Sequence, residues 1–217
     1  MKAYHPVLEK YDRQAPKYDR RWNRSFGRAL LHACMEAVPW TQVQRVLDVG
    51  CGTGALEQSV FERFHLPVRL IGVDASLAML REAQAKLNGA GNGFLSWGNA
   101  LAEALPFRTA GVDAVVCNNS FHYYRRPAQV LGEFHRVIKP DGCLVLADWC
   151  NDYPANKLGH WALRVADRTG IHRYGLERCY GMEELAELLT AAGFQIEIAR
   201  RFEVDWGWGV MVYRARA

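Results

Sequence analysis

The sequence predicts an α/β fold in which helices cover both faces of a mostly parallel sheet. The strongest sign is the stretch around residues 45–54, where a short apolar run ends in the alternating glycines of Gly-Cys-Gly-Thr-Gly. A helical pattern with Leu56 and Val60 on one face follows at once. A glycine loop between a strand and a helix places backbone N–H groups at a helix start, where nucleotides bind in open α/β sheets.

The other elements follow from local patterns along the chain. The expected order is helix 25–38, strand 45–49, helix 55–64, strand 70–74, helix 76–87, strand 94–97, strand 112–117, helix 127–138, strand 143–147, helix 182–192 and strands 195–204 and 210–214. Ser76 is a good helix N-cap, Pro127 suits a first helical position, and Gly193 is a good helix stop. The last two strands read as a hairpin closed at residues 205–209.

Composition points to a single globular domain. Half of the 217 residues are hydrophobic, and no apolar run approaches the roughly 20 residues of a membrane helix. The charged N-terminus has no apolar core, so we expect no signal peptide. The six cysteines form no Cys-x-x-Cys pair and the seven histidines lack metal-ligand spacing, which predicts free thiols, a cytoplasmic protein and no metal.

The positive charge gathers at the start of the chain. The net charge is +4, and residues 1–28 carry eight basic groups against three acidic ones. Such a segment could bind nucleic acid or an anionic substrate, but a solvated helical face has the same composition. We favour the solvated face, so nucleic acid is not an expected partner.

Two acidic residues distinguish between the ligands that a glycine loop can hold. The loop also fits the dinucleotide fingerprint Gly-x-Gly-x-x-Ala. Asp48, inside the strand before the loop, would repel a pyrophosphate but can hold a cationic amino-acid group. Asp74, twenty residues past Gly54, ends the next apolar run, where a carboxylate can accept both hydroxyls of a ribose. Together they favour an adenosine with a cationic tail.

Five motifs, in order, resemble those of the class I S-adenosylmethionine (SAM) dependent methyltransferases, most closely the quinone-biosynthesis and small-molecule branch. They are Val46-Leu47-Asp48-Val49-Gly50-Cys51-Gly52-Thr53-Gly54, Gly72-Val73-Asp74-Ala75-Ser76 with Met79, Ala104-Leu105-Pro106-Phe107, Asp113-Ala114-Val115-Val116 and Arg136-Val137-Ile138-Lys139-Pro140-Asp141-Gly142. The resemblance implies one methyltransferase domain over residues 1–217. Its fold would be a Rossmann-like three-layer sandwich, with a seven-stranded mostly parallel sheet and an antiparallel last strand. The cofactor would be SAM and its product S-adenosylhomocysteine (SAH).

The resemblance places the cofactor along the glycine loop and the neighbouring strand ends. The predicted cofactor-binding residues are Tyr18, Asp48, Gly50, Gly52, Gly54, Asp74, Ala75, Met79, Asn99, Ala100, Leu101 and Asn118. Asp48 would hold the methionine ammonium group and Asp74 the ribose. Met79 would border the adenine, although a plain core methionine fits as well. Either the Asn99 side chain, which we favour, or the Ala100–Leu101 backbone would contact the adenine amino group.

Residues 1–40 are expected to form a helical cover over the cofactor. In related methyltransferases a Tyr-Asp segment like 11–19 lies above the cofactor, with a tyrosine close to its methionine part. This makes Tyr18 and Tyr11 site candidates. The alternative is that both rings only pack this segment onto the core.

The acceptor side is predicted from the polar and aromatic loop 118–124 and from an insert at 150–181. His122 in the loop could act as a general base, or it could be a structural histidine bonded to the backbone. The insert contains an apolar helical stripe, Leu158, Trp161, Ala162 and Val165, expected to roof the substrate mouth or, alternatively, to lie in a dimer contact. The predicted substrate-binding residues are Tyr11, His122, Tyr123, Trp149, Trp161 and Trp206.

Together these expectations predict a methyltransferase that acts on a small-molecule acceptor. Displacement at a sulfonium needs alignment and a dry pocket more than a catalytic dyad. The alternatives are an RNA or protein methyltransferase using the basic N-terminal face, a SAM-binding protein without catalysis, and a nicotinamide oxidoreductase. The sequence leaves open whether O, N or C is methylated, and whether the protein is a monomer or a homodimer.

Overall fold

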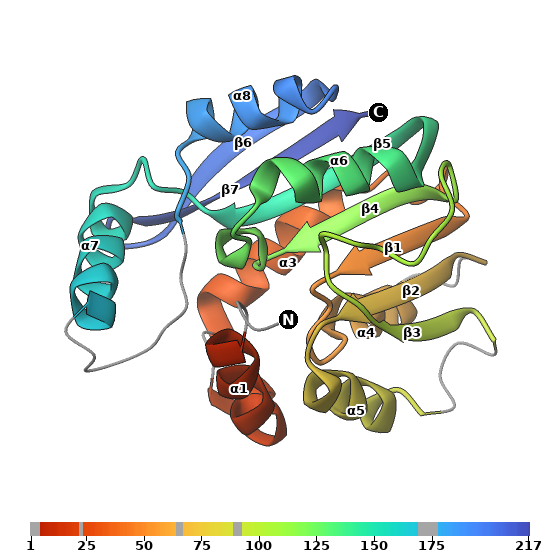
Figure 1. Cartoon of the computed structure of the whole chain (residues 1–217), viewed down its shortest axis with the longest axis horizontal. Helices are drawn as coiled ribbons and strands as arrows, with labels where there is room; N and C mark the ends of the chain where they lie inside the picture. Colours follow the sequence, from red (N-terminus) through yellow and green to blue (C-terminus); the bar gives the residue numbers. More distant parts are fainter. Residues whose placement is uncertain (1–4, 22–23, 64–66, 89–92, 169–177) are drawn as a thin grey trace.

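A single seven-stranded sheet forms the centre of the molecule in the computed structural model, which describes residues 5–21, 24–63, 67–88, 93–168 and 178–217 (Figure 1). The strands are β1 (Arg45–Val49), β2 (Arg69–Asp74), β3 (Leu95–Asn99), β4 (Val112–Asn118), β5 (Ile138–Trp149), β6 (Gln195–Asp205) and β7 (Trp208–Arg216). Their order is β3-β2-β1-β4-β5-β7-β6. The pairs from β3 to β5 are parallel, and β7 is antiparallel to both of its neighbours. The expected sheet with its antiparallel last strand is confirmed.

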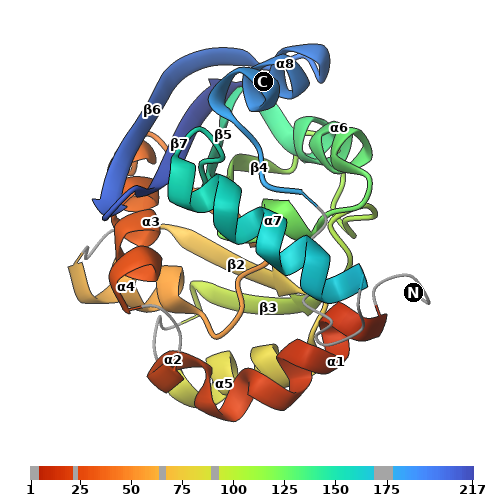
Figure 2. The same cartoon turned by 90° about the vertical axis from the view of Figure 1, so that its left-hand side faces the viewer.

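Helices lie on both faces of this sheet and beyond its carboxyl edge. They are α1 (His5–Gln14), α2 (Tyr18–Arg21), α3 (Arg24–Ala37), α4 (Ala55–Arg63), α5 (Leu77–Lys86), α6 (Pro127–Val137), α7 (Pro154–Arg168) and α8 (Met182–Ala191), with short 3-10 turns η2 (Ala15–Lys17) and η3 (Phe121–Tyr123). One face is covered by α6 and α8, the other by α3 and α4. Figure 2 looks towards the carboxyl edge, with α7 crossing in front of the sheet and α1 and α2 below it.

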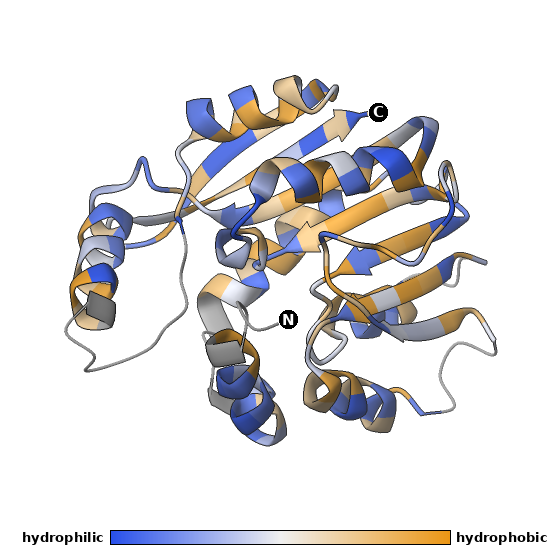
Figure 3. Ribbon diagram, viewed as in Figure 1, coloured by the Kyte–Doolittle hydropathy of each residue, from blue (hydrophilic) through white to orange (hydrophobic). Residues whose placement is uncertain are grey.

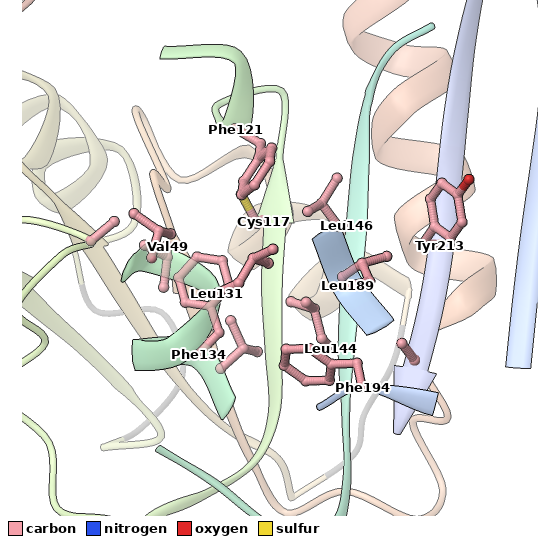
Figure 4. Packing of buried hydrophobic residues seen from close by; sticks show 14 of the residues in the cluster. Val49, Cys117, Phe121, Leu131, Phe134, Leu144, Leu146, Leu189, Phe194 and Tyr213 are labelled. Atoms are coloured by element: carbon pink, nitrogen blue, oxygen red, sulfur yellow. The ribbon is translucent and has the colours of Figure 1, made fainter. Parts of the chain in front are cut away.

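Two apolar cores, one on each face, hold these layers together. Figure 4 shows the core under α6 and α8, where Leu131 and Phe134 meet Leu144, Leu146 and Leu189, all fully buried. Burial of each such side chain contributes about 1.5–3 kcal/mol. The central strands are apolar along most of their length, as Figure 3 shows, because both of their faces are covered.

Local signals in the sequence set the ends of several elements. The Ser76 hydroxyl accepts a hydrogen bond from the Met79 N–H at 3.1 Å and so caps α5. Pro127 occupies the first turn of α6, and Gly193 takes a φ of 95° just after α8. Strand β5 is longer than expected, because it begins directly at the end of α6 and continues to Trp149.

Two further properties are clear in the described part of the chain. All six cysteines are buried and unpaired, as expected for free thiols. No helix among the described residues has both the length and the apolar character needed to cross a bilayer.

Candidate functional site

A cavity of about 1210 Å³ lies at the carboxyl edge of the sheet, bordered by the glycine loop, the loop 118–124, α1 and α7. Pockets for one drug-sized molecule usually have about 300–1,000 Å³. The cavity therefore has room for a nucleoside cofactor and a second molecule together. Residues of α1 and α7, the two helices that Figure 2 shows at the carboxyl edge of the sheet, contribute to its lining.

Most of the residues expected from the sequence line this cavity. Those that do are Tyr11, Tyr18, Asp48, Gly50, Gly52, Asp74, Ala75, Met79, Ala100, Leu101, Asn118, His122, Tyr123 and Trp149. They come from segments far apart in the sequence that the parallel sheet brings to one edge. Their roles in binding stay predictions, whereas four other residues have to be corrected.

Gly54 serves packing instead of ligand binding. It does not line the cavity, and a Cβ atom there would lie 2.7 Å from the Trp97 ring and 3.2 Å from the Ala83 Cβ. Its φ of 75° also favours glycine. The third glycine of the loop therefore lets α5 and β3 pack closely beneath the site.

Asn99 lies outside the cavity at the exposed end of β3. Its side-chain nitrogen donates to the carbonyl oxygens of Asp74 and Ala75, at 2.9 and 3.0 Å, which holds the two strand ends together. The cavity wall begins one residue later, at Ala100. The lining therefore favours the alternative contact, the Ala100–Leu101 backbone, over the Asn99 side chain, and the adenine contact itself stays a prediction.

Two of the three tryptophans expected at the acceptor face solvent. Trp161 on α7 is 64% exposed and Trp206 in the β6–β7 turn is 92% exposed. The large members of the apolar stripe of α7, Leu158, Trp161 and Val165, are exposed. Ala162 of the stripe lines the cavity together with Gly159, His160 and Leu163. Trp208, the first residue of β7, lines the cavity, whereas Trp206 lies in the turn before that strand.

The glycine loop is shaped by contacts with the strands beside it. The N–H groups of Gly50 and Cys51 both donate to the Val73 carbonyl, at 2.8 and 3.1 Å. Gly50 has a φ of 80°, and a Cβ there would lie 2.5 Å from the Ser120 hydroxyl. Gly52 is different, since a Cβ there would have no neighbour within 4 Å. Gly52 therefore leaves its part of the cavity open, while Gly50 allows the loop 118–124 to approach.

Asp74 is oriented by two backbone groups at the end of β2. One carboxylate oxygen accepts from the Gly52 N–H at 2.9 Å, and the other accepts from the Ser76 N–H at 2.8 Å. Burial raises the pKa of Asp74, and these two N–H groups oppose that rise. The remaining lone pairs of both oxygens are available to a ligand in the cavity.

Two buried oxygen atoms in the cavity wall have no hydrogen-bond partner within the described residues. They are Oδ1 of Asp48, a residue that is 4% exposed, and Oδ1 of Asn118. Burial, together with the nearby Glu57 and Asp74 carboxylates, raises the pKa of Asp48 well above its usual value. Buried polar atoms in proteins are nearly always hydrogen-bonded, so this pair marks the place of a ligand with donor groups.

The N-terminal helices are tied to the floor of the cavity by acidic side chains. Asp12 accepts a hydrogen bond from the Ser76 hydroxyl at 2.6 Å. Asp19 accepts one from the Thr53 hydroxyl at 2.6 Å and forms an ion pair with Lys86 at 3.0 Å. These contacts hold α1 and α2 over the glycine loop and the start of α5.

A group of tyrosines lies between this N-terminal segment and the loop 118–124. The Tyr11 hydroxyl donates to the Tyr123 hydroxyl at 2.7 Å, and the two rings meet edge to face. Burial raises the pKa of Tyr11 and Tyr123, and it raises the pKa of Tyr18 to about 12 with Asp74 adding to the effect. All three phenols are therefore protonated near pH 7.

His122 forms a buried pair with Asp148, the residue that follows the apolar part of β5. Its Nδ1 lies 2.6 Å from one Asp148 oxygen, and its backbone N–H donates to the other at 3.0 Å. The Trp149 N–H also donates to this carboxylate, at 2.7 Å. Sequence reasoning missed Asp148, although β4 and β5 are neighbours and their carboxyl ends must meet.

The acceptor end of the cavity combines an aromatic wall with a second imidazole. The rings of Phe26 and Trp149 stack with centroids 4.8 Å apart, and Trp208 meets both edge to face. His160 faces the cavity from α7, and its buried Nε2 has no partner within the described residues. Burial and the nearby Arg164 and other basic groups lower the pKa of His160. Sequence reasoning also missed His160, because a lone histidine on a helix has no spacing to interpret.

Comparison with known proteins adds a family match to this geometry. The family described as methyltransferase domain matches residues 47–146. The chain is 31% identical over 219 aligned positions to a demethylmenaquinone methyltransferase of Lactiplantibacillus plantarum, and the match covers 91% of each chain. It is 27% identical to a malonyl-[acyl-carrier protein] O-methyltransferase of Methylovorus sp., covering 88% of this chain and 64% of that protein.

The fold also has close counterparts among solved structures. One is the 1,6-didemethyltoxoflavin-N1-methyltransferase of Burkholderia thailandensis, solved with 1,6-didemethyltoxoflavin and S-adenosylhomocysteine bound. The two structures superpose with a TM-score of 0.75 over 99% of this chain and 88% of that one, at 18% identity. At that identity the likeness concerns the arrangement of helices and strands alone.

Proposed function

The chain belongs to the class I SAM-dependent methyltransferases of the quinone-biosynthesis branch, and we propose that it methylates a small, mainly apolar acceptor held against the His122–Asp148 pair. As a member of this family it is an enzyme that uses SAM as its methyl donor. The single observation that carries the proposal is that Asp48, Asp74 and His122 all line one cavity, with room for both reactants.

The residues around the glycine loop fit SAM. The unpartnered oxygens of Asp48 and Asn118 suit the donor groups of an amino-acid tail, and Asp74 is oriented to accept from a ribose. The Ala100–Leu101 backbone and Met79 would border the adenine, and Gly52 leaves the backbone open to close approach. When bound there, SAM supplies a methyl group on a positively charged sulfur.

The acceptor would lie between the loop 118–124, α1 and α7. The stacked rings of Phe26 and Trp149 offer a flat apolar surface, which suits a planar acceptor. The Lactiplantibacillus plantarum relative is named for demethylmenaquinone, so we propose a reduced quinone or a similar aromatic hydroxyl compound as the first acceptor class to examine.

His122 would act as the general base for this acceptor. Its Nδ1 is bonded to Asp148, which leaves Nε2 as the ring nitrogen for a ligand in the cavity. A proton removed by Nε2 from an acceptor hydroxyl makes the acceptor electron-rich, and Asp148 stabilises the imidazolium that forms. Positioned proton transfer of this kind is typically worth about 10²–10⁴-fold in rate.

The outer segments would control access to the site. We propose that residues 1–40 act as a cover, tied down by Asp12 and Asp19, and that the insert 150–181 forms a wall of the acceptor end. Residues 1–4, 22–23 and 169–177 of these segments lie outside the described residues. The free thiols support a cytoplasmic location, and we propose a monomer or homodimer without nucleic acid.

A labelling experiment tests this function directly. Purified protein is incubated with SAM carrying an isotope-labelled methyl group and with demethylmenaquinol or simpler aromatic hydroxyl compounds, and the products are read by mass spectrometry. We expect label in the acceptor, and a loss of that label with His122→Ala at unchanged SAH affinity. A protein that binds neither SAM nor SAH in a thermal-shift titration would contradict the proposal.

A further inference from the structure

Glu57 is a fully buried carboxylate that has no role in the methyl transfer proposed above. It lies in the first turn of α4 and is 0% exposed. Neither of its oxygens has a hydrogen-bond partner within the described residues, and it does not line the cavity. A charged carboxylate in such a place is costly, so it must be compensated by a proton or by a nearby positive charge.

The sheet places Glu57 beside Asp48. Asp48, Gly72 and Trp97 are register partners across the parallel strands β1, β2 and β3, so their side chains leave the same face of the sheet. Gly72 has no side chain, and a Cβ there would lie 2.8 Å from a Glu57 oxygen and 2.4 Å from the Trp97 ring. Glu57 therefore occupies the space above Gly72, between Trp97 and Asp48.

We propose that Asp48 and Glu57 share one proton in the ligand-free protein, and that the ammonium group of the cofactor replaces this proton on binding. The inference rests on the proposed function, which brings the ammonium to the unpartnered oxygen of Asp48. Below about pH 7 one positive charge leaves as another arrives, so binding leaves the net charge of the buried pair and its counter-charge unchanged. Glu57 is a positioning residue here, because it acts through Asp48 and does not touch the cavity.

The burial of Asp48 and Glu57, and the charges around them, favour a proton held by this pair in the ligand-free protein. Burial raises the pKa of Glu57 to about 7, with the nearby N–H of its own backbone and Lys86 opposing, and burial with Glu57 and Asp74 raises the pKa of Asp48 well above its usual value. The titratable groups that face the pair are Cys34 from α3, Cys51 from the glycine loop, Asp74 from β2, Lys86 from α5 and Cys117 from β4. Burial raises the pKa of these three thiols above the ordinary thiol value, so they stay protonated throughout.

The sign of the pH dependence follows from these raised pKa values. Below about pH 7 the pair holds a proton that binding must expel, so SAH should bind more weakly as the pH falls. Release of one proton corresponds to a tenfold change in association constant per pH unit. Above pH 7 the proton is already gone, and the association constant should level off until the amine of the ligand itself deprotonates near pH 8.

Isothermal titration calorimetry with SAH measures this release without turnover. Titrations at pH 6.0 and 7.5, each in two buffers of different ionisation enthalpy, count the protons set free. We expect about one proton per SAH at pH 6.0, much less at pH 7.5, and none with 5′-methylthioadenosine, which lacks the amino-acid tail. Glu57→Gln should abolish both the release and the tenfold slope. Glu62→Gln, in the exposed last turn of the same helix, should behave as wild type.

The outcomes separate this inference from the proposed function. SAH that binds with a buffer-independent enthalpy and a flat pH profile would overturn the shared proton and leave the methyltransferase proposal intact. Release of equal size with 5′-methylthioadenosine would also overturn it. Absence of SAH binding at every pH would contradict the proposed function itself. Should Glu57→Gln fail to fold, the wild-type titrations with the two ligands still decide the question.

Discussion

Replacement of Asp74 by alanine should remove the ribose anchor of the cofactor. The Asp74 carboxylate is fixed by the N–H groups of Gly52 and Ser76, at 2.9 and 2.8 Å, and it faces the cavity from the end of β2. A ribose offers two adjacent hydroxyl groups to such a carboxylate. The substitution removes both acceptors at once and also leaves the two backbone N–H groups without their partner.

The expected loss follows from the strength of hydrogen bonds to a charged group. Each is worth about 1.5–3 kcal/mol, and 1.4 kcal/mol is tenfold in affinity. Loss of even one such bond should weaken SAH binding by about 10- to 150-fold. Isothermal titration calorimetry at pH 7.5 measures this change, where the shared proton proposed for Asp48 and Glu57 contributes little.

Asp113 provides a matched control, because it lies near the start of β4, at the end of the strands away from the cavity. It also accepts two backbone N–H groups, those of Gln44 and Arg45 at 3.0 and 2.8 Å, and it pairs with Lys139. Asp113→Ala should lower the free energy of unfolding and leave SAH affinity unchanged. If Asp74→Ala binds SAH within twofold of the wild type, or if Asp113→Ala loses as much affinity, the ribose assignment is wrong.

Three further predictions concern catalysis, the loop and the core. Asp148→Asn should lower kcat by about 10²–10⁴-fold at unchanged SAH affinity, because the imidazole loses the partner that orients it; steady-state kinetics with unchanged kcat would refute this. Gly50→Ala should destabilise the fold strongly, since its φ is 80° and its Cβ meets Ser120. Gly52→Ala, with a φ of 55° but open space around its Cβ, should lose only about 1–2 kcal/mol of stability and bind SAH more weakly; urea unfolding and calorimetry compare the two. Phe134→Ala should cost about 3–5 kcal/mol in urea unfolding, and a loss under 1 kcal/mol would contradict its place in the core.

The sheet could be predicted from the sequence because its signals are local. The apolar run of β1, the capping hydroxyl of Ser76 and the proline that opens α6 each act within a few residues. The positions of Asp48 and Asp74 follow equally well, because parallel strands deliver their carboxyl ends to one edge. Asp48 and Asp74 were therefore placed at the cavity without any tertiary information, whereas Asn99, at the end of the edge strand β3, was not.

Side chains whose direction depends on packing could not be predicted in this way. The apolar stripe of α7 was expected either to roof the substrate mouth or to lie in a dimer contact. Its large side chains, Trp161 among them, face solvent, whereas Gly159, with Trp208 against it, lines the cavity; the dimer contact stays a prediction. Gly54 matched a binding motif but is required by the Trp97 ring. Asp148 was missed because its role depends on a partner 26 residues away in the chain.

Because all six cysteines are buried, the rate at which they react with a thiol reagent measures how often the protein opens. Burial raises the pKa of every one of these thiols, to about 11 at Cys143 and Cys150 and well above 9.0 at Cys34. The native state therefore exposes hardly any thiolate to an alkylating reagent, so a cysteine is modified only when local or global unfolding exposes it. Cys51 and Cys179 line the cavity, whereas the others belong to the packed interior. The alkylation rates of the cavity cysteines therefore measure how often the cavity opens, whereas the rates of the interior cysteines measure global unfolding.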